Sequence, residues 1–354
     1  MSYLIKYLKN NGNKSFDEFK FNEIDAAIYS ILPYLNFMGI VDNPILIKDA
    51  YEKFTNRFIL KDTDKFMEEN KKLFKEMAKS KRFQNNVITS YKKLVNQETQ
   101  FAAVTINVAK HFKFIAFEGT DDELVGWEEN FKMGYMYPIP AQELANKYLK
   151  ENIKFNDLVV YVGGHSKGGN LAVSAVMEQN IINRYKIEYV FNFDGPGFLP
   201  DVYNSKKLTK INKKIKNYYP YESIVGMIFD NQGDKKIVKS NAYQVFQHDL
   251  HTWMWEDNKF VLANLSDYSK KFHLKINDIL NKFSSDEIEK FVNLFFSMLY
   301  KAGYVLKSEL KTVSITKMKN ILKETTSLSN EDRQLLLEMF KAFIAHYKDE
   351  NDKQ

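Results

Sequence analysis

The sequence contains no cysteine, which excludes disulfides, thiolate metal sites and a cysteine nucleophile. Only 7 proline and 14 glycine residues occur among 354, too few for a low-complexity or collagen-like chain. The N-terminus lacks the apolar region and cleavage site of a signal peptide. The longest strongly apolar runs, such as residues 291–300, are much shorter than a membrane span. These absences predict a soluble, cytoplasmic protein.

Charge is nearly balanced, with 51 Lys and Arg residues against 45 Asp and Glu, a net charge of +6. The basic residues are mostly lysines spread along the chain, and we find no nucleic-acid-binding motif, so we expect no nucleic-acid partner. Hydrophobic residues make up 44% and aromatic residues 15% of the chain. This composition is typical of a globular protein with a large core or an apolar pocket.

The residue pattern divides the chain into three segments. The residue pattern predicts helices at 1–95 and again at 263–354. One of the later helices begins at the capping box Ser284-x-x-Glu287. Between them, residues 101–108 and 112–117 predict a β-hairpin. Helices and strands then alternate, with helices at 141–152, 168–179 and 208–216, strands at 157–162 and 187–193, and weaker strands at 217–219 and 235–239. We therefore expect an α/β core at 96–262, a mostly parallel sheet with helices on both faces, and helical additions at both ends.

The strongest chemical signal is the pentapeptide Gly164-His-Ser-Lys-Gly168. A G-x-S-x-G sequence is weak evidence alone, but here a buried strand precedes it and an apolar helix follows it. That is the setting of a nucleophile elbow, in which the central residue, Ser166, is held on a strained turn. The alternative interpretation is a glycine-rich turn or a phosphate cradle. The Walker A spacing that would support a phosphate cradle is absent.

A serine nucleophile needs a base, and only six histidines are available. His165 is next to Ser166 and its side chain should point away, so we interpret it as structural. His248 and His251 lie together in a loop after the last predicted strand. In a fold with a nucleophile elbow, the histidine comes after the serine and the acid in the sequence, which is the position of this loop. We prefer His248 as the base and keep His251 as the alternative.

The acid should follow a strand between the serine and the histidine. Glu222 comes at a proline-marked strand exit, and Asp194 ends the strand after the elbow helix. We prefer Glu222, because Asp194 lies in an Asp-Gly-Pro-Gly sequence that a turn alone would explain. Asp194 stays open as the alternative acid.

The oxyanion of an acyl-transfer intermediate needs two N–H donors. The Lys167 backbone N–H, at the positive end of the elbow helix, is one candidate. The Thr120 N–H, in the loop after the strand at 112–117, is the other. We find neither a His-x-x-x-His motif nor a clustered Asp triplet, so we expect no metal and no cofactor.

Together these motifs resemble the α/β-hydrolase superfamily, in particular its class 3 lipase-like branch and the bacterial Mbeg1-like family. The matching stretches are 117–127, 140–142, 163–172, 192–198, 222–226 and 247–249. The resemblance implies Ser166 as nucleophile, His248 as base and the Glu222 position as acid. Family members often have Asp at the Glu222 position, which keeps Asp194 open. Lipases of the class usually have Arg where this chain has Glu118.

One further feature is a group of lysines at positions 206, 207, 210, 213, 214 and 216. Leu208, Ile211 and Ile215 fall on one face of the helix predicted there, so the plain interpretation is a covering helix with a solvated lysine face. The alternative is a patch that makes weak peripheral contact with an anionic membrane.

We therefore predict a serine hydrolase that cleaves carboxylic esters through an acyl-enzyme on Ser166, with His248 as base and Glu222 as acid. We expect the aromatic-rich helical ends to cover an apolar acyl pocket, which favours esters with an apolar acyl group. Two alternatives stay open. One is an acyltransferase with the same triad. The other is a non-catalytic lipid- or protein-binding module that keeps the fold.

Overall fold

The computed structural model describes residues 2–57, 64–311 and 315–351, and an eight-stranded sheet forms its centre. The strands follow one another across the sheet in chain order: β1 (Ile45–Leu46), β2 (Val87–Val95), β3 (Gln100–Ala109), β4 (Phe112–Phe117), β5 (Val159–His165), β6 (Ile187–Phe193), β7 (Ile215–Pro220) and β8 (Asp234–Val238). Strands β1 to β4 pair antiparallel, and β4 to β8 pair parallel. The predicted hairpin is β3–β4, and the mostly parallel sheet is confirmed. A separate hairpin joins β9 (Trp255–Glu256) to β10 (Lys259–Phe260).

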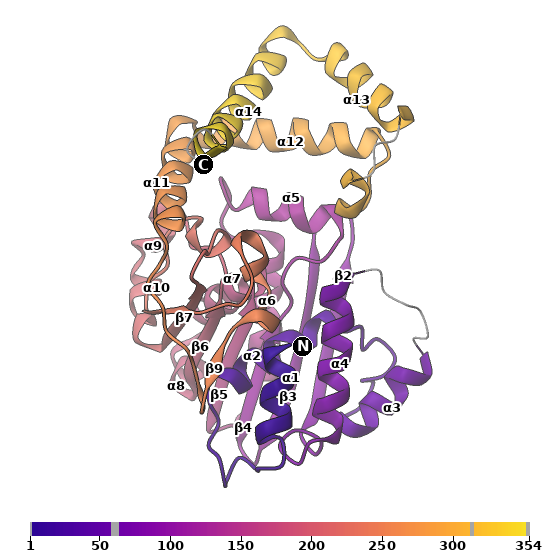
Figure 1. Ribbon diagram of the computed structural model, residues 1–354, viewed down its shortest axis with the longest axis vertical. Coiled ribbons are helices and arrows are strands. Elements are labelled where there is room, and N and C mark those ends of the chain that lie inside the picture. The colour runs from indigo at the N-terminus through magenta and orange to yellow at the C-terminus, as the bar shows by residue number, and fades with distance from the viewer. Residues whose placement is uncertain (1, 58–63, 312–314, 352–354) are drawn as a thin grey trace.

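Helices surround this sheet (Figure 1). The α-helices are α1 (Tyr3–Asn11), α2 (Glu23–Ile31), α3 (Ile47–Arg57), α4 (Lys65–Lys79), α5 (Leu124–Lys132), α6 (Pro140–Asn152), α7 (Lys167–Met177), α8 (Ile181–Lys186), α9 (Pro200–Tyr203), α10 (Lys206–Thr209), α11 (Asp267–Lys282), α12 (Ser285–Lys301), α13 (Ile315–Ser327) and α14 (Asn330–Asn351). Short 3₁₀ turns lie at η1 (Leu32–Tyr34), η2 (Asn212–Lys214), η3 (Val225–Met227), η4 (Gln244–His248), η5 (Leu250–Thr252) and η6 (Lys307–Lys311).

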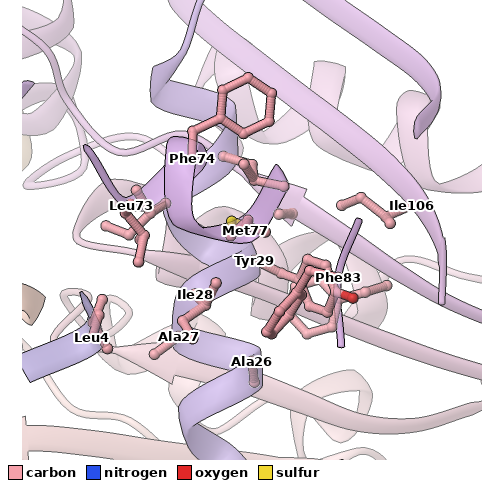
Figure 2. Close-up of a cluster of buried hydrophobic side chains, with 14 of the residues drawn as sticks. Leu4, Ala26, Ala27, Ile28, Tyr29, Leu73, Phe74, Met77, Phe83 and Ile106 are labelled. Carbon is pink, nitrogen blue, oxygen red and sulfur yellow. The ribbon is translucent and has the colours of Figure 1, made fainter. Parts of the chain in front are cut away.

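Helices cover both faces of the sheet. Because side chains alternate along each strand, one strand contributes residues to two separate cores. In β4, Phe114 and Ala116 point into a core shared with the N-terminal helices, whereas Ile115 and Phe117 point into a core shared with α6 and α7. Figure 2 shows part of the first core, where Phe74 and Met77 of α4 lie near Tyr29 of α2. Helices therefore cover both faces, as predicted for the α/β fold class.

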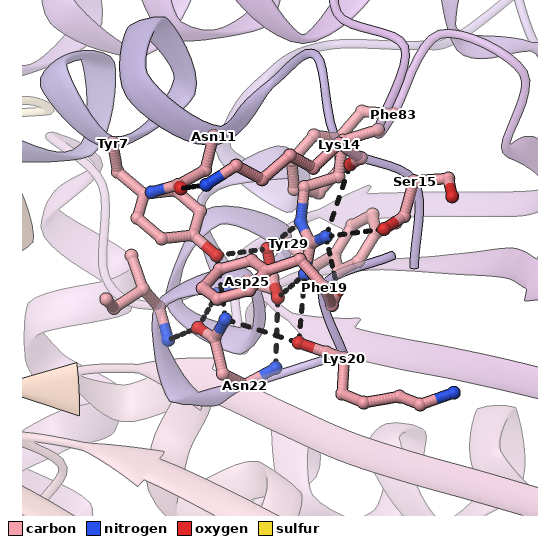
Figure 3. A network of polar contacts seen from close by, with 12 residues as sticks. Tyr7, Asn11, Lys14, Ser15, Phe19, Lys20, Asn22, Asp25, Tyr29 and Phe83 are labelled. Atoms are coloured by element: carbon pink, nitrogen blue, oxygen red, sulfur yellow. Dashed lines mark hydrogen bonds and ion pairs between the residues drawn. The ribbon is translucent and has the colours of Figure 1, made fainter. Parts of the chain in front are cut away.

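An ion pair inside the N-terminal layer fixes the start of α2. The Arg82 guanidinium donates to both carboxylate oxygens of Asp25, at 2.7 and 2.5 Å, and both side chains are fully buried. Asp25 also accepts from the Asn22 N–H, which completes the capping box of α2 (Figure 3). A buried ion pair persists only where further hydrogen bonds satisfy it, and Arg82 also donates to the Phe19 carbonyl at 2.7 Å.

The C-terminal helices lie together at one end of the molecule (Figure 1). Helix α12 packs on α5, α13 and α14, around a third apolar cluster that includes Phe291, Phe296 and Leu124. The Tyr300 hydroxyl of α12 donates to Glu128 of α5 at 2.7 Å. In the ranges that the structure describes, no helix has the length and apolar content to cross a membrane.

Two predictions about secondary structure are wrong. Residues 1–95 are not all helical, since they contain β1 and β2. Strand β2 buries only Ile88 fully, so it lacks the clear alternation of buried and exposed residues that would have predicted a strand. Residues 208–216 do not form one helix. Helix α10 ends at Thr209, η2 follows, and β7 begins at Ile215. The apolar residues Leu208, Ile211 and Ile215 are buried all the same, so burial at helical spacing did not require a helix here.

Candidate active site

Ser166 stands on a sharp turn between β5 and α7. Its backbone has φ 58° and ψ −133°, a conformation that a residue with a side chain rarely adopts. A Cβ added at Gly164 would lie 2.2 Å from the Gly168 carbonyl oxygen, and one at Gly168 would lie 2.2 Å from the Phe117 carbonyl oxygen. Only glycine fits these two positions. The Ser166 hydroxyl does not cap α7, so the turn presents it at the carboxyl end of the sheet.

His248 is paired with Asp194. The His248 Nδ1 lies 2.6 Å from the Asp194 Oδ2, and the Asp194 carboxylate is completely buried. Asp194 directly follows β6, the neighbour of β5, and the Ser166 N–H donates to the carbonyl of the preceding residue, Phe193, at 2.9 Å. Adjacent parallel strands therefore deliver the serine and the carboxylate to the same edge of the sheet.

The second Asp194 oxygen is held by donors from the stretch after β7. Oδ1 accepts from the Ser223 hydroxyl at 2.5 Å and from the Gly226 N–H at 3.1 Å. These bonds orient the carboxylate and compensate its burial. Sequence reasoning missed Ser223, although it lies in the matching stretch 222–226, because Glu222 in the same stretch was the candidate acid.

The expected contact between Glu222 and His248 is not made. The Glu222 carboxylate accepts instead from the Gln244 N–H and from the Gln247 Nε2, both at 2.6 Å. Gln247 returns a bond, since its Oε1 accepts from the Glu222 N–H at 3.1 Å. Glu222 thus braces η4, the turn that carries His248, while the alternative acid, Asp194, contacts the imidazole. A turn alone does not explain Asp194, because the carboxylate of this residue contacts His248 on η4.

His165 and His251 both use their ring nitrogens for packing. The His165 Nε2 lies 2.8 Å from the His248 carbonyl oxygen, which can only accept, so Nδ1 accepts from the Tyr34 hydroxyl at 3.0 Å. Burial lowers the pKa of His165 well below its usual value, with a further contribution from nearby His248. The ring is therefore neutral and positions the loop of His248.

His251, the alternative base, bonds elsewhere. Its Nδ1 lies 2.6 Å from the Ser2 hydroxyl and its Nε2 lies 2.8 Å from the Asn70 Oδ1. Burial lowers its pKa as well. Both ring nitrogens are occupied between α1 and α4, so His251 has no nitrogen left to receive a proton from Ser166.

The two candidate oxyanion donors, the backbone N–H groups of Thr120 and Lys167, have no acceptor among the described residues. A Cβ added at Gly119 would lie 3.0 Å from the Ser166 Cβ, so the loop carrying Thr120 passes directly beside the serine. The Thr120 hydroxyl is held by Asn130 of α5, whose Nδ2 donates to it at 2.8 Å.

The Lys167 side chain turns away from the serine into a buried polar network. Its ammonium donates to the carbonyl and side-chain oxygens of Gln100 at 2.7 and 2.9 Å and to Glu129 of α5 at 3.0 Å. Gln100 in turn donates to Glu118 at 2.7 Å. Burial raises the pKa of Glu118 to about 8. The buried cation near Glu118 and the loop of Thr120 is therefore the Lys167 ammonium. Neither Glu129 nor Gln100 was singled out from the sequence, since no motif marks them.

The Ser166 hydroxyl and His248 form no hydrogen bond within the described ranges. Such bonds are often long without substrate and shorten when it binds. No group of three or more His, Asp or Glu side chains is arranged to hold a metal ion among the residues that the structure describes. The site therefore consists of a hydroxyl, an imidazole–carboxylate pair and two free N–H groups.

A mostly parallel sheet with helices on both faces, and a serine on the turn after its central strand β5, define an α/β-hydrolase fold. Residues 77–297 match the Mbeg1-like family, so the chain belongs to that family. No curated protein matches the sequence.

Solved structures of lipases are similar to part of the chain. M37 lipase is 16% identical, with a TM-score of 0.37, and the alignment covers 58% of this chain and 69% of that one. The Rhizomucor miehei lipase propeptide complex is 12% identical with the same TM-score, covering 60% of this chain and 67% of that one. Lip2 lipase from Yarrowia lipolytica is 13% identical with a TM-score of 0.29, covering 44% and 66%.

Replacing Lys167 by Met should destabilise the fold strongly. The substitution leaves the Glu129 carboxylate buried without its cation, which costs about 3–5 kcal/mol in the free energy of unfolding. Urea unfolding would measure the loss. The control is Lys207→Met, because Lys207 forms an exposed ion pair with Glu178 and should change stability by less than about 1 kcal/mol. Equal effects of the two substitutions would contradict the network.

Stability should fall on the acid side because of His165. Below the ordinary histidine pKa of about 6.5 the unfolded chain binds a proton that the buried ring cannot accept. The free energy of unfolding should therefore decrease as the pH falls from about 6.5, by at most about 1.4 kcal/mol per pH unit for this one group. His165→Gln keeps a donor and an acceptor but removes the titration, so its stability should depend less steeply on pH in the same window. Parallel slopes for the two proteins would refute this origin.

Proposed function

We propose that this chain is a serine hydrolase of carboxylic esters that forms an acyl-enzyme on Ser166. The observation that carries the proposal is the 2.6 Å contact between His248 and the buried Asp194, at the carboxyl end of the strand next to the Ser166 turn. A non-catalytic binding module has no need of a strained serine beside an oriented imidazole.

The chemistry follows from the protonation of the pair. An ionised carboxylate only accepts, so the His248 Nδ1 carries the proton and Nε2 is free to act as base. Nε2 takes the hydroxyl proton as the Ser166 Oγ attacks the ester carbonyl carbon, and Asp194 stabilises the imidazolium. The negative oxygen of the tetrahedral intermediate is bound by the Thr120 and Lys167 N–H groups.

The intermediate then collapses. The ester C–O bond breaks, and the His248 imidazolium returns its proton to the departing alcohol, which leaves the acyl group on Ser166. Water enters, loses a proton to Nε2 and attacks the acyl carbon. The bond between that carbon and the Ser166 Oγ then breaks, and the imidazolium returns its proton to Oγ, which releases the carboxylic acid and regenerates the hydroxyl. In this scheme Asp194 is the acid of the triad, and Glu222 positions His248 by bracing η4.

An apolar rim beside the imidazole indicates the class of acyl group. Tyr243, Val245 and Phe246, on and next to η4, are exposed although they are large and apolar, and Tyr221 lies exposed at the end of β7. The Tyr221 N–H bonds to the end of β8, which ties this residue to the same edge of the sheet. Contiguous exposed apolar residues mark binding surfaces, so we expect an ester with an apolar acyl chain.

Acyl transfer to an acceptor other than water would use the same residues. The two reactions differ only in what attacks the acyl group on Ser166, so analysis of the products formed with added alcohols separates them.

A fluorophosphonate probe should label the folded protein at Ser166. Ser166→Ala should abolish labelling and lower kcat for an ester by about 10⁶-fold if the triad acts as a unit. His248→Ala should remove labelling as well. A folded wild-type protein that stays unlabelled would falsify the proposal.

The identity of the acid can be tested with two isosteric substitutions. Asp194→Asn should lower kcat by about 10⁴-fold, because the amide no longer holds the imidazole in the productive tautomer. Glu222→Gln, the matched control, should lower kcat by less than about tenfold, because it only weakens the brace on η4. The reverse order of effects would assign the acid to Glu222.

Phe246→Ser tests the apolar rim. The substitution should raise KM for an ester with a long acyl chain by about tenfold, because it removes apolar contact area, and should leave KM for an acetate ester almost unchanged. Steady-state kinetics of p-nitrophenyl esters of both lengths would measure the difference. An equal change for both chain lengths would show that the acyl chain does not contact the rim.

A further inference from the structure

An exposed apolar patch lies at the amino ends of β5 and β6. Its members are Phe155 and Leu158, in the loop before β5, and Ile181, Ile182 and Tyr185, on α8 before β6. Phe155 is 98% and Tyr185 89% exposed. Helix α8 buries none of its six residues, although three of them are large and apolar. A short helix that hides none of its apolar side chains projects from the surface and does not contribute to the core.

The two segments of this patch are held side by side. The Lys186 ammonium, at the end of α8, donates to the carbonyl oxygens of Lys154 and Phe155 at 2.7 and 2.9 Å, and lies 5.5 Å from the centre of the Phe155 ring. The residues that follow, Ile187 and Val160, are paired in the sheet. The patch is therefore one surface supported by the sheet, and not two independent loop tips.

Positive charge surrounds the apolar residues. Lys154, Arg184 and Lys186 lie within the patch segments, and the Lys214 ammonium donates to the Ile187 carbonyl at 2.5 Å. None of these four makes an ion pair with an acidic side chain in the described ranges, whereas Lys207, at the start of the lysine group of 206–216, is paired with Glu178. The exposed carboxylates in the same segments are those of Glu151 and Glu188.

A cavity of about 290 Å³ opens beside this surface. Its lining includes Lys110, Lys113 and Lys154, with one carboxylate, Asp157, which pairs with Lys113 at 2.9 Å. Neither Lys110 nor Lys154 forms an ion pair within the described part of the chain, and the Lys154 ammonium donates to the Glu151 carbonyl at 2.6 Å. The cavity thus adds cationic side chains at the edge of the apolar residues.

We propose that this face docks on an anionic lipid bilayer. The aromatic and aliphatic side chains enter the headgroup region, and the surrounding lysines and Arg184 attract acidic lipid headgroups. A second copy of the chain is a poorer occupant, because two such faces would bring their uncompensated cations together.

The proposal is separate from the proposed catalysis. Ser166 follows the carboxyl end of β5, and Phe155 precedes its amino end. Seven extended residues span about 20 Å, so a docked protein holds its serine on the side facing away from the bilayer. Docking therefore concentrates the protein at a membrane surface and leaves the site open to esters in the aqueous phase.

Co-sedimentation with vesicles tests the docking. We expect the full chain to bind vesicles of phosphatidylcholine with about one third phosphatidylglycerol, to bind phosphatidylcholine alone weakly, and to lose the difference at high salt. Lys154→Gln with Arg184→Gln should lower the partition coefficient on anionic vesicles by about 30-fold. Phe155→Ser with Tyr185→Ser should lower it by at least about tenfold on the same vesicles.

Matched controls use residues of the same kind on the C-terminal helices. Lys319→Gln with Lys323→Gln removes equal charge from α13, and Leu274→Ser with Leu322→Ser removes exposed apolar side chains from α11 and α13. These controls should bind as the wild type does. Fluorophosphonate labelling of every variant reports the catalytic proposal separately, because no substituted residue lies at the site.

Three results would overturn the docking proposal. They are failure of the wild type to bind anionic vesicles, equal losses in the patch variants and the controls, and a dimer in light scattering that the Phe155→Ser, Tyr185→Ser variant dissociates. The last result would assign the face to a second copy of the chain.

Discussion

The structure of the site depends on how closely α7 approaches the ends of β4 and β5. Gly164 and Gly168 lie so close to neighbouring backbone that a Cβ at either position would clash with a carbonyl oxygen. This close approach holds Ser166 at a positive φ. The buried packing of β5 and α7 overcomes the local cost of that conformation. Because the turn is rigid, the serine hydroxyl, the first N–H groups of α7 and the loop after β4 are fixed relative to one another.

A buried network of charged and polar side chains beneath the turn helps to hold Ser166 in place. Lys167 contributes its backbone N–H to the side where the oxyanion would form, and its ammonium to a buried network on the other side. One residue therefore joins the elbow to β3 through Gln100 and to α5 through Glu129. Sequence reasoning selected Lys167 only for its N–H, because its side chain belongs to no motif that marks a buried lysine.

Local chemistry made much of the fold predictable. The elbow glycines, the β3–β4 hairpin and the Ser284 capping box each depend on neighbours in sequence, and the structure contains all three. The choice between Glu222 and Asp194 was different, because both follow strands and both precede His248. It depends on which carboxylate the sheet brings to the imidazole, and the contact that the structure contains joins His248 to Asp194, 54 positions apart. The role of Asp194 as the acid stays a proposal. The three-segment division of the chain stays a prediction.

Helix α5 contacts both candidate oxyanion donors through consecutive residues. Glu129 binds the Lys167 ammonium, and Asn130 binds the Thr120 hydroxyl. The preceding residue, Glu128, receives the Tyr300 hydroxyl of α12. A helix moves as a unit, so a molecule that displaced α12 would shift the groups on both sides of Ser166 together. The C-terminal helices, although distant from the serine in sequence, are thereby connected through α5 to the residues on both sides of Ser166.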